Sequence, residues 1–136
     1  MKDAQSLQLE MLGALQARDL ALLRELLDPD YVYMSADGIE QKGPDAGVAV
    51  AETYLRAFPD LEFEIRHHYA AGPDVSILEL TARGTHQAML QGIPATGRAV
   101  EVVVCNIIEA QDGRIVRERE YFDGLSVMRQ LGVIAD

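Results

Sequence analysis

The amino-acid sequence predicts an α+β fold in which a curved, mostly antiparallel sheet wraps around N-terminal helices and leaves a cone-shaped cavity. Three observations lead to this prediction. Apolar residues recur at helical spacing from about residue 3 to residue 58. From Leu61 to Asp123 the spacing changes to the two-residue alternation of half-buried strands, with turn residues between the runs. A short helical segment ends the chain, so helices and strands are segregated, as is typical of α+β proteins.

The composition indicates one domain over residues 1–136, with 49% hydrophobic and 25% charged residues. The formal net charge of −10 argues against a nucleic-acid partner, because phosphate binding requires clustered Lys and Arg. Cys105 is the only cysteine, which excludes an intrachain disulfide and fits a cytoplasmic protein. The sequence has neither a signal-peptide pattern nor an apolar run of about 20 residues, so we expect no membrane partner.

Two short helices are predicted first. Residues 3–17 carry one apolar stripe, and Asp19 is placed to cap a second helix that stops at Asp28 and Pro29. The stripes consist of Leu7, Met11, Ala14 and Leu15 in the first helix and of Leu22, Leu23, Leu26 and Leu27 in the second. Two such helices that meet at a corner suit a lid over a sheet.

Residues 31–34 are predicted to form a short strand, and a loop leads from there to a third helix that runs from Asp45 to Phe58. Tyr33 of the strand, and Tyr54 and Phe58 of the helix, are expected to form a pocket wall or part of the core.

Two strands are predicted next, over residues 61–66 and 75–87. In the second strand the charged residues occupy the odd-numbered positions, which we assign to solvent. The even-numbered face then includes Leu80 and leaves His86 pointing inward near the end of the strand.

A hairpin of residues 97–110 and 113–123 organises the predicted site. If Gly113 closes a type I turn with a bulge, Ala110 lies opposite Arg114, and the even-numbered residues of both strands share one face. A two-residue Asp-Gly turn is the alternative, and it would break this shared face by pairing Gln111 with Arg114.

The shared face of the hairpin is apolar except near its middle, where the polar residues are Asn106, Glu118 and Glu120. Two carboxylates and an amide on an apolar face indicate a pocket, which Val104 and Phe122 would also line. A final amphipathic helix is predicted over residues 124–131.

Each polar candidate has a functional and a structural interpretation. Desolvation would raise the pKa of an inward Glu120 toward neutrality, as a general acid or base requires, whereas on a solvated face it would pair with Arg. Glu118 is either a second acid that perturbs Glu120 or a rim residue. Asn106 lies opposite Glu118 in this register. Its amide would either donate a hydrogen bond to an enolate oxygen or serve as a structural hydrogen-bond partner inside the sheet. His86 would contact substrate or be a satisfied core residue.

A metal site is not expected. His67 and His68 are adjacent, so on a strand they point to opposite faces, and no third ligand follows at usable spacing. No phosphate loop, nucleophile elbow or dinucleotide fingerprint occurs.

Five segments, in order, resemble the SnoaL-like polyketide cyclase family of the nuclear-transport-factor-2-like superfamily: YLRAFPDLEFEI, TARGTH, GIPATGR, DGRIV and YFDGLSVMRQLG. The likeness runs from about Tyr54 to Gly132, and the first third of the chain matches only in its helical layout. The resemblance implies a cystatin-like α+β fold with a cone-shaped cavity for a small hydrophobic molecule.

Family members of this type close a ring by intramolecular aldol condensation without a metal or organic cofactor, using an acidic residue in the last long strand. Glu120 matches that residue, where a typical member has Asp. The family's first-strand His is replaced here by Tyr33 or Met34, and the Trp that often precedes the acidic residue is Arg119.

The leading hypothesis is therefore an enzyme of cyclase or isomerase type, with Glu120 as acid/base and with His86 and Asn106 positioning a carbonyl-bearing ligand. The departures from the family pattern favour a second hypothesis, a binding or accessory protein that uses the same cavity without turnover. Hydroxylation-type or epoxide-opening chemistry is a third. The superfamily also implies a homodimer formed through the convex side of the sheet, where Val103, Cys105 and Ile107 supply an apolar strip.

Overall fold

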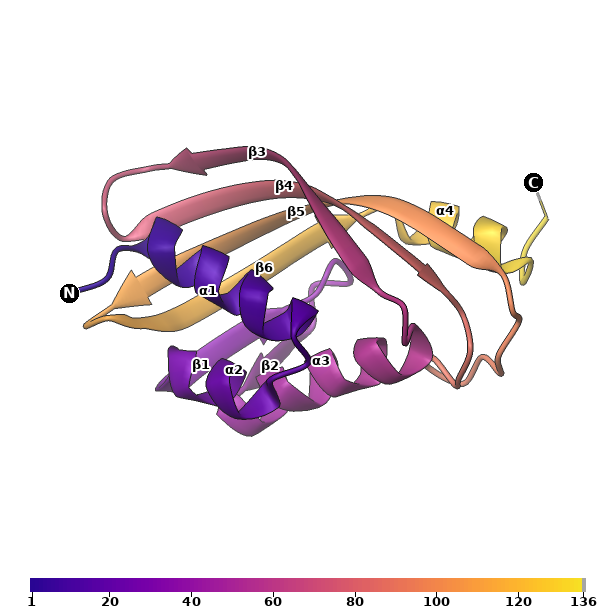
Figure 1. Cartoon of the computed structure of the whole chain (residues 1–136), viewed down its shortest axis with the longest axis horizontal. Helices are drawn as coiled ribbons and strands as arrows, with labels where there is room; N and C mark the ends of the chain where they lie inside the picture. The colour runs from indigo at the N-terminus through magenta and orange to yellow at the C-terminus, as the bar shows by residue number, and fades with distance from the viewer. Residues whose placement is uncertain (136) are drawn as a thin grey trace.

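The computed structural model describes residues 1–135 as one curved sheet with helices on its concave side (Figure 1). The two termini lie at opposite ends of the long axis. The helices are α1 (Ala4–Gln16), α2 (Leu20–Leu26), α3 (Pro44–Ala57) and α4 (Gly124–Leu131), and the strands are β1 (Leu27–Met34), β2 (Glu40–Lys42), β3 (Glu62–Ala70), β4 (Val75–Thr85), β5 (Ala99–Gln111) and β6 (Arg114–Phe122). The predicted α+β fold is confirmed.

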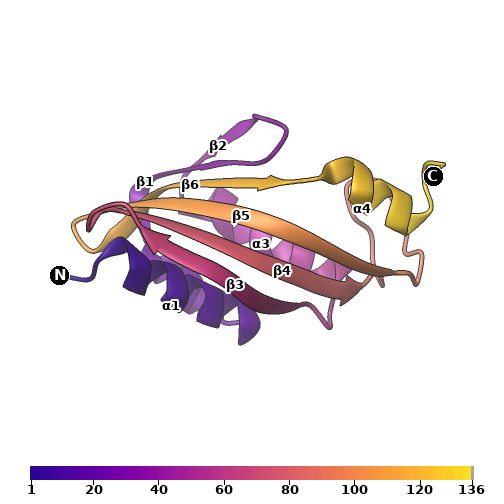
Figure 2. The same cartoon turned by 90° about the horizontal axis from the view of Figure 1, so that it is seen from above.

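The six strands form an open sheet in the order β2-β1-β6-β5-β4-β3 (Figure 2). All neighbours are antiparallel except β1 and β6, which pair in parallel. The sequence predicted only residues 31–34 of β1 and left β2 as a loop. The helix α2 ends at Leu26, one residue earlier than predicted, and Leu27, which was expected in the helix, already pairs with Ile115 of β6.

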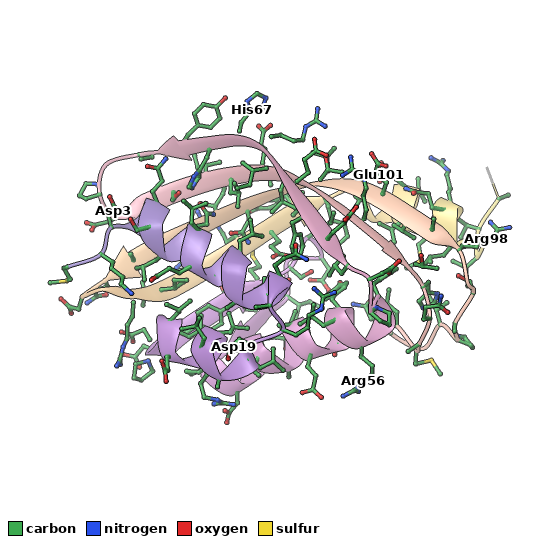
Figure 3. All side chains as sticks on the ribbon, in the orientation of Figure 1. Asp3, Asp19, Arg56, His67, Arg98 and Glu101 are labelled. Atoms are coloured by element: carbon green, nitrogen blue, oxygen red, sulfur yellow. The ribbon has the colours of Figure 1, made fainter. Side chains whose placement is uncertain are left out.

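Three of the four helices begin with an Asp whose carboxylate accepts a hydrogen bond from the backbone N–H three residues later. Asp3 and Asp19, labelled in Figure 3, begin α1 and α2, and Asp123 begins α4. The helix α3 instead starts with Pro44 after Gly43, whose φ of 92° is readily accessible only to glycine.

The β5–β6 turn is the two-residue alternative that the sequence left open. Gln111 pairs with Arg114 across Asp112 and Gly113, which both have positive φ, as a type I′ hairpin turn requires. The preferred prediction, with Ala110 opposite Arg114, is therefore wrong.

A bulge at Val116 nevertheless restores the shared face. Beyond it, Asn106 lies opposite Glu120, whereas the predicted register placed it opposite Glu118. On the turn side of the bulge, Ile115 rather than Val116 faces the core and is fully buried. The even-numbered residues that matter for the site still share the concave face.

The core lies between α1, α2, α3 and the concave face of the sheet. Glycine permits the closest approach: a Cβ on Gly47 of α3 would lie 2.6 Å from the Tyr31 ring of β1. The main buried cluster comprises Ala4, Leu7, Met11, Ala14, Leu23, Leu26, Leu27, Tyr31, Tyr33, Ile108 and Ile115. No helix within residues 1–135 is long and apolar enough to cross a membrane.

Candidate active site

A mainly apolar cavity of about 300 Å³ lies between the concave face of the sheet and the helices α1, α3 and α4. Leucine, valine and aromatic side chains from these elements form most of its wall. Its polar lining includes Asn106 of β5 and the carboxylates of Glu118 and Glu120 of β6. The volume is at the lower end of the range for small-molecule sites, about 300–1,000 Å³.

The two carboxylates point the same way because they are two residues apart on β6. The side chain of Glu118 is the more deeply buried, with 7% of its surface exposed. Its Oε1 accepts a hydrogen bond of 2.5 Å from the Tyr31 hydroxyl, and its Oε2 accepts one of 2.7 Å from Asn106 Nδ2. Glu118 is thus held by two donors on two neighbouring strands.

Glu120 has longer hydrogen bonds than Glu118 and is less completely buried. Its Oε1 accepts a hydrogen bond of 3.1 Å from the same Asn106 nitrogen, and its Oε2 is 3.3 Å from the Tyr33 hydroxyl. Burial first, and the neighbouring Glu118 carboxylate second, raise the pKa of Glu120 to about 8, against the smaller lowering effects of the Tyr33 and Asn106 hydrogen bonds.

The parallel pairing of β1 with β6 brings the two tyrosines to these carboxylates. Tyr33 lies opposite Glu118 in the register, and Tyr31 is on the same face two residues earlier. Burial, and then the nearby carboxylates, raise the pKa of both phenols well above their ordinary value, so both hydroxyls remain hydrogen-bond donors at all ordinary pH values. The pKa of Tyr54, across the cavity on α3, is raised by burial and by Glu120.

Asn106 links the carboxylate pair to a second polar group behind the cavity wall. Its Oδ1 and its backbone carbonyl accept hydrogen bonds of 2.9 and 3.0 Å from Nε2 of Gln8 on α1. The Oε1 of Gln8 accepts from the Ser76 hydroxyl at 2.5 Å and lies 3.0 Å from Nε2 of His68. Gln8 and Ser76 are fully buried.

Most of the residues singled out in the sequence come together around the cavity. Those that line it are Asn106, Glu118, Glu120, Tyr33, Tyr54, Phe58, Leu80, Val104 and Phe122. His86 does not line the cavity, although it is fully buried as predicted. Its Nδ1 accepts a hydrogen bond of 3.2 Å from the Thr96 backbone N–H, and its ring packs on Phe58, with ring centroids 5.5 Å apart. Within the described residues its Nε2 is buried without a hydrogen-bond partner, so His86 is a core residue whose ring is only partly satisfied.

Sequence reasoning missed Tyr31, Gln8 and His68 as members of the polar cluster. A signal for Gln8 was present, because it interrupts the buried stripe of α1 at helical spacing between Ala4 and Met11. Tyr31 shares its strand face with Tyr33, which was predicted to be a wall residue. Strict alternation from Leu61 would place His68 on the outer face, but a bulge at Arg66 shifts the register and turns His68 inward, opposite Leu78.

The two adjacent histidines point to opposite faces, as predicted. His67 lies on the outer side of β3, away from the helices (Figure 3), where its ring stacks on that of Tyr69. Within residues 1–135, no three His, Cys, Asp or Glu side chains are grouped so that they could hold a metal ion.

A curved open sheet that closes on helices around a cavity is the fold of the nuclear-transport-factor-2-like class. Within this class the chain belongs to the SnoaL-like polyketide cyclase family, whose profile matches residues 5–131.

Two curated relatives are aklanonic acid methyl ester cyclases. DauD of Streptomyces sp. (strain C5) is 34% identical over 113 residues, which cover 82% of this chain and 67% of DauD. DnrD of Streptomyces peucetius is 37% identical over 95 residues, which cover 68% of this chain and 64% of DnrD. The chain therefore matches about two thirds of the length of these relatives.

A solved structure with a similar fold is AclR from Streptomyces galilaeus, for which a hydroxylase function has been suggested. It superposes with a TM-score of 0.84 at 30% identity, covering 96% of this chain and 82% of AclR.

Proposed function

We propose that this protein is a SnoaL-like enzyme that performs cofactor-independent acid/base chemistry, of cyclase or isomerase type, on a small hydrophobic molecule with carbonyl groups. The observation that carries the proposal is the pair Glu118 and Glu120 in an apolar cavity, where the pKa of Glu120 is raised to about 8. A carboxyl with a pKa near the working pH serves both as a base and, once protonated, as an acid. The solitary Cys105 fits a cytoplasmic setting.

Glu120 would act twice in a ring closure. Its carboxylate takes a proton from the carbon next to a carbonyl, and the C–H electron pair forms an enolate. The enolate carbon attacks a second carbonyl of the same molecule, so a C–C bond forms and that carbonyl oxygen becomes an alkoxide. The carboxylic acid of Glu120 then returns the proton to the alkoxide, which balances the reaction without an oxidant or reductant.

Asn106 and Tyr33 support this role by geometry. Both donate to Glu120 across distances of 3.1 and 3.3 Å, which leaves the carboxyl aimed from the strand toward the cavity. Glu118, held in place by two short hydrogen bonds, lies beside Glu120 on the same face of β6.

The test measures proton abstraction directly, with 1-tetralone as an apolar bicyclic ketone probe. We expect the protein to accelerate exchange of its α-hydrogens for deuterium in D₂O, followed by mass spectrometry, and we expect the rate to rise with pH through about 8 as Glu120 deprotonates. Glu120→Gln should lower the rate by about 100-fold or more. The control Glu62→Gln removes an exposed carboxylate of β3 and should leave the rate unchanged. Equal exchange rates for wild type and Glu120→Gln would refute Glu120 as the base.

A ligand-binding or accessory protein is the second candidate. The observation that favours it is the number of donors already satisfying the two carboxylates, namely Tyr31, Tyr33 and Asn106. Saturable quenching of tyrosine fluorescence by 1-tetralone without any α-exchange would support this candidate. The similarity to AclR also supports assaying hydroxylation-type turnover in the same cavity.

A further inference from the structure

Gln8 connects the α1 helix to the acidic part of the cavity wall without itself lining the cavity. All four hydrogen-bonding capacities of its amide are used inside the protein. The nitrogen donates to Asn106 twice, and the oxygen faces the Ser76 hydroxyl and the His68 ring. Four hydrogen bonds therefore hold the buried Gln8 amide in a single orientation.

The chemistry of these contacts fixes the orientation of both amides. The backbone carbonyl of Asn106 can only accept, so the Gln8 atom that lies 3.0 Å from it must be the nitrogen. That same nitrogen lies 2.9 Å from the Asn106 side chain, which must therefore present its oxygen to Gln8. The Asn106 nitrogen is then left to face the two carboxylates, at 2.7 Å from Glu118 and 3.1 Å from Glu120.

The other end of the Gln8 amide is consistent with this order. Ser76 donates its hydroxyl hydrogen to Gln8 Oε1 at 2.5 Å, and Nε2 of His68 lies 2.9 Å from the Ser76 oxygen and 3.0 Å from Gln8 Oε1. A hydrogen on His68 Nε2 satisfies both oxygens. Donors therefore run in one direction, from half-buried His68 on the edge strand β3 to the carboxylates on β6.

We propose that Gln8, supported by Ser76 and His68, is a positioning residue that locks the Asn106 amide with its nitrogen toward Glu118 and Glu120. This inference rests on the proposed acid/base function of Glu120. The amides do not conduct protons in this scheme. Their role is to keep a hydrogen-bond donor against the carboxylates, which favours the ionised form that a general base requires.

The fixed orientation of the Asn106 amide affects the pKa of Glu120 through the groups that surround this carboxyl. The groups that face it are Glu118 on its own strand, Tyr31 and Tyr33 on β1, Tyr54 on α3 and Asn106 on β5. A tyrosine hydroxyl can always turn its hydrogen back toward a carboxylate, whereas a flipped Asn106 amide presents only an acceptor there. Releasing Asn106 would therefore replace a donor by a carbonyl oxygen and raise the pKa of Glu120 further.

The decisive variant is Gln8→Glu, which keeps the size of the side chain but removes its donor. The introduced carboxylate, when ionised, would accept from the Asn106 nitrogen and turn the Asn106 oxygen toward Glu118 and Glu120. We expect the Glu120 titration, followed by ¹³C NMR of labelled glutamate carboxyls and assigned with Glu120→Gln, to shift upward by about one pH unit, the size expected when a carboxylate loses a hydrogen bond. Gln8→Met, which releases Asn106 without a new charge, should shift it in the same direction.

The matched control is Gln16→Glu, the same substitution on the same helix. The Gln16 side chain bonds to the Leu61 and Phe63 backbone at the helix end, and its replacement should leave the Glu120 titration within about 0.2 units of wild type. A folded Gln8→Glu or Gln8→Met variant with an unchanged Glu120 titration would overturn the lock. If neither variant folds, the side-chain NH₂ signals of Asn106 in wild type decide: nuclear Overhauser contacts from them to Gln8 Nε2 hydrogens, with none toward Glu118, would refute it.

The outcome separates the lock from the enzyme proposal. A Glu120 titration that shifts in Gln8→Glu, combined with no α-exchange of 1-tetralone in wild type, keeps the lock and removes the proposed catalysis. If the α-exchange rate falls in Glu120→Gln but the Gln8 variants leave both the rate and the Glu120 titration unchanged, the proposed catalysis is supported and the role of Gln8 is refuted.

Discussion

A carboxyl group whose pKa is raised by folding makes the protein less stable as the pH rises. The folded state of this protein binds the Glu120 proton up to a pKa of about 8, whereas the unfolded chain releases it near 4.5. Its contribution to stability is therefore fully present below about 4.5 and is lost progressively as the pH approaches 8.

Glu120→Gln removes this pH-dependent loss, because an amide does not ionise. We predict that the unfolding midpoint of the variant matches that of wild type near pH 4, gains on it between about 4.5 and 8, and keeps a constant advantage above pH 8. The advantage at neutral pH should be on the order of a few kcal/mol in unfolding free energy. Urea unfolding across this pH range measures it, with Glu62→Gln as the exposed-carboxylate control. A pH-independent difference would mean that Glu120 is solvated or fully paired.

At the scale of elements, the alternation of apolar and polar residues in strands and the helix caps could be predicted from the sequence, but the pairing between strands could not. The periodicity placed α1, α3 and α4 within a residue or so, and the odd-even pattern placed Asn106 and both carboxylates on one face. The register of β5 and β6 depends on the bulge at Val116, which no local pattern marks. The parallel pairing of β1 with β6, which delivers Tyr31 to Glu118, is a contact between distant segments that propensity does not encode.

The contact between α3 and β1 carries a prediction about helix packing. Ala usually stabilises a helix relative to Gly by about 1 kcal/mol. At Gly47, however, the added Cβ would lie 2.6 Å from the buried Tyr31 ring, so overpacking of about 1–3 kcal/mol should exceed that gain. We predict that Gly47→Ala lowers the free energy of unfolding by about 1 kcal/mol, the overpacking cost less the helix-propensity gain.

The matched control is Gly13→Ala in α1, where the new Cβ would meet nothing within 4 Å beyond its chain neighbours and the backbone of its own helix. It should raise the free energy of unfolding by about 0.5–1 kcal/mol. Urea midpoints at constant m-value compare the two variants. A Gly47→Ala protein as stable as Gly13→Ala would show that α3 moves away from β1 without penalty.

At the scale of the whole molecule, the site exists only because the sheet folds over α1. Gln8 and Asn106 are separated by 98 residues in the sequence yet share two hydrogen bonds. Hydrophobic periodicity identifies the face on which each residue lies, but the contact between two faces follows from curvature and strand order. For this reason the wall residues of the cavity were predictable, whereas the polar cluster behind Asn106 was not.

The convex face of the same sheet carries an apolar surface opposite to the cavity. Tyr69, Val103 and Tyr121 expose 53%, 51% and 42% of their surface there, and the register places Tyr69, Ile77 and Ile107 in one row across β3, β4 and β5. Contiguous exposed apolar surface of this kind marks interaction sites. We predict that two copies of the chain associate through this face.

Sedimentation equilibrium at micromolar concentration tests the association with a matched pair of variants. Val103→Glu places a charge on the convex apolar surface and should give a monomer, because an unpaired charge in a dry interface is strongly unfavourable. Leu9→Glu changes an exposed apolar residue of α1, on the concave side, and should leave the dimer intact. A wild-type protein that is monomeric at micromolar concentration would refute the predicted dimer. Since the cavity lies on the concave side of the sheet, monomeric Val103→Glu should also retain α-exchange of 1-tetralone, with each protomer working through its own Glu120.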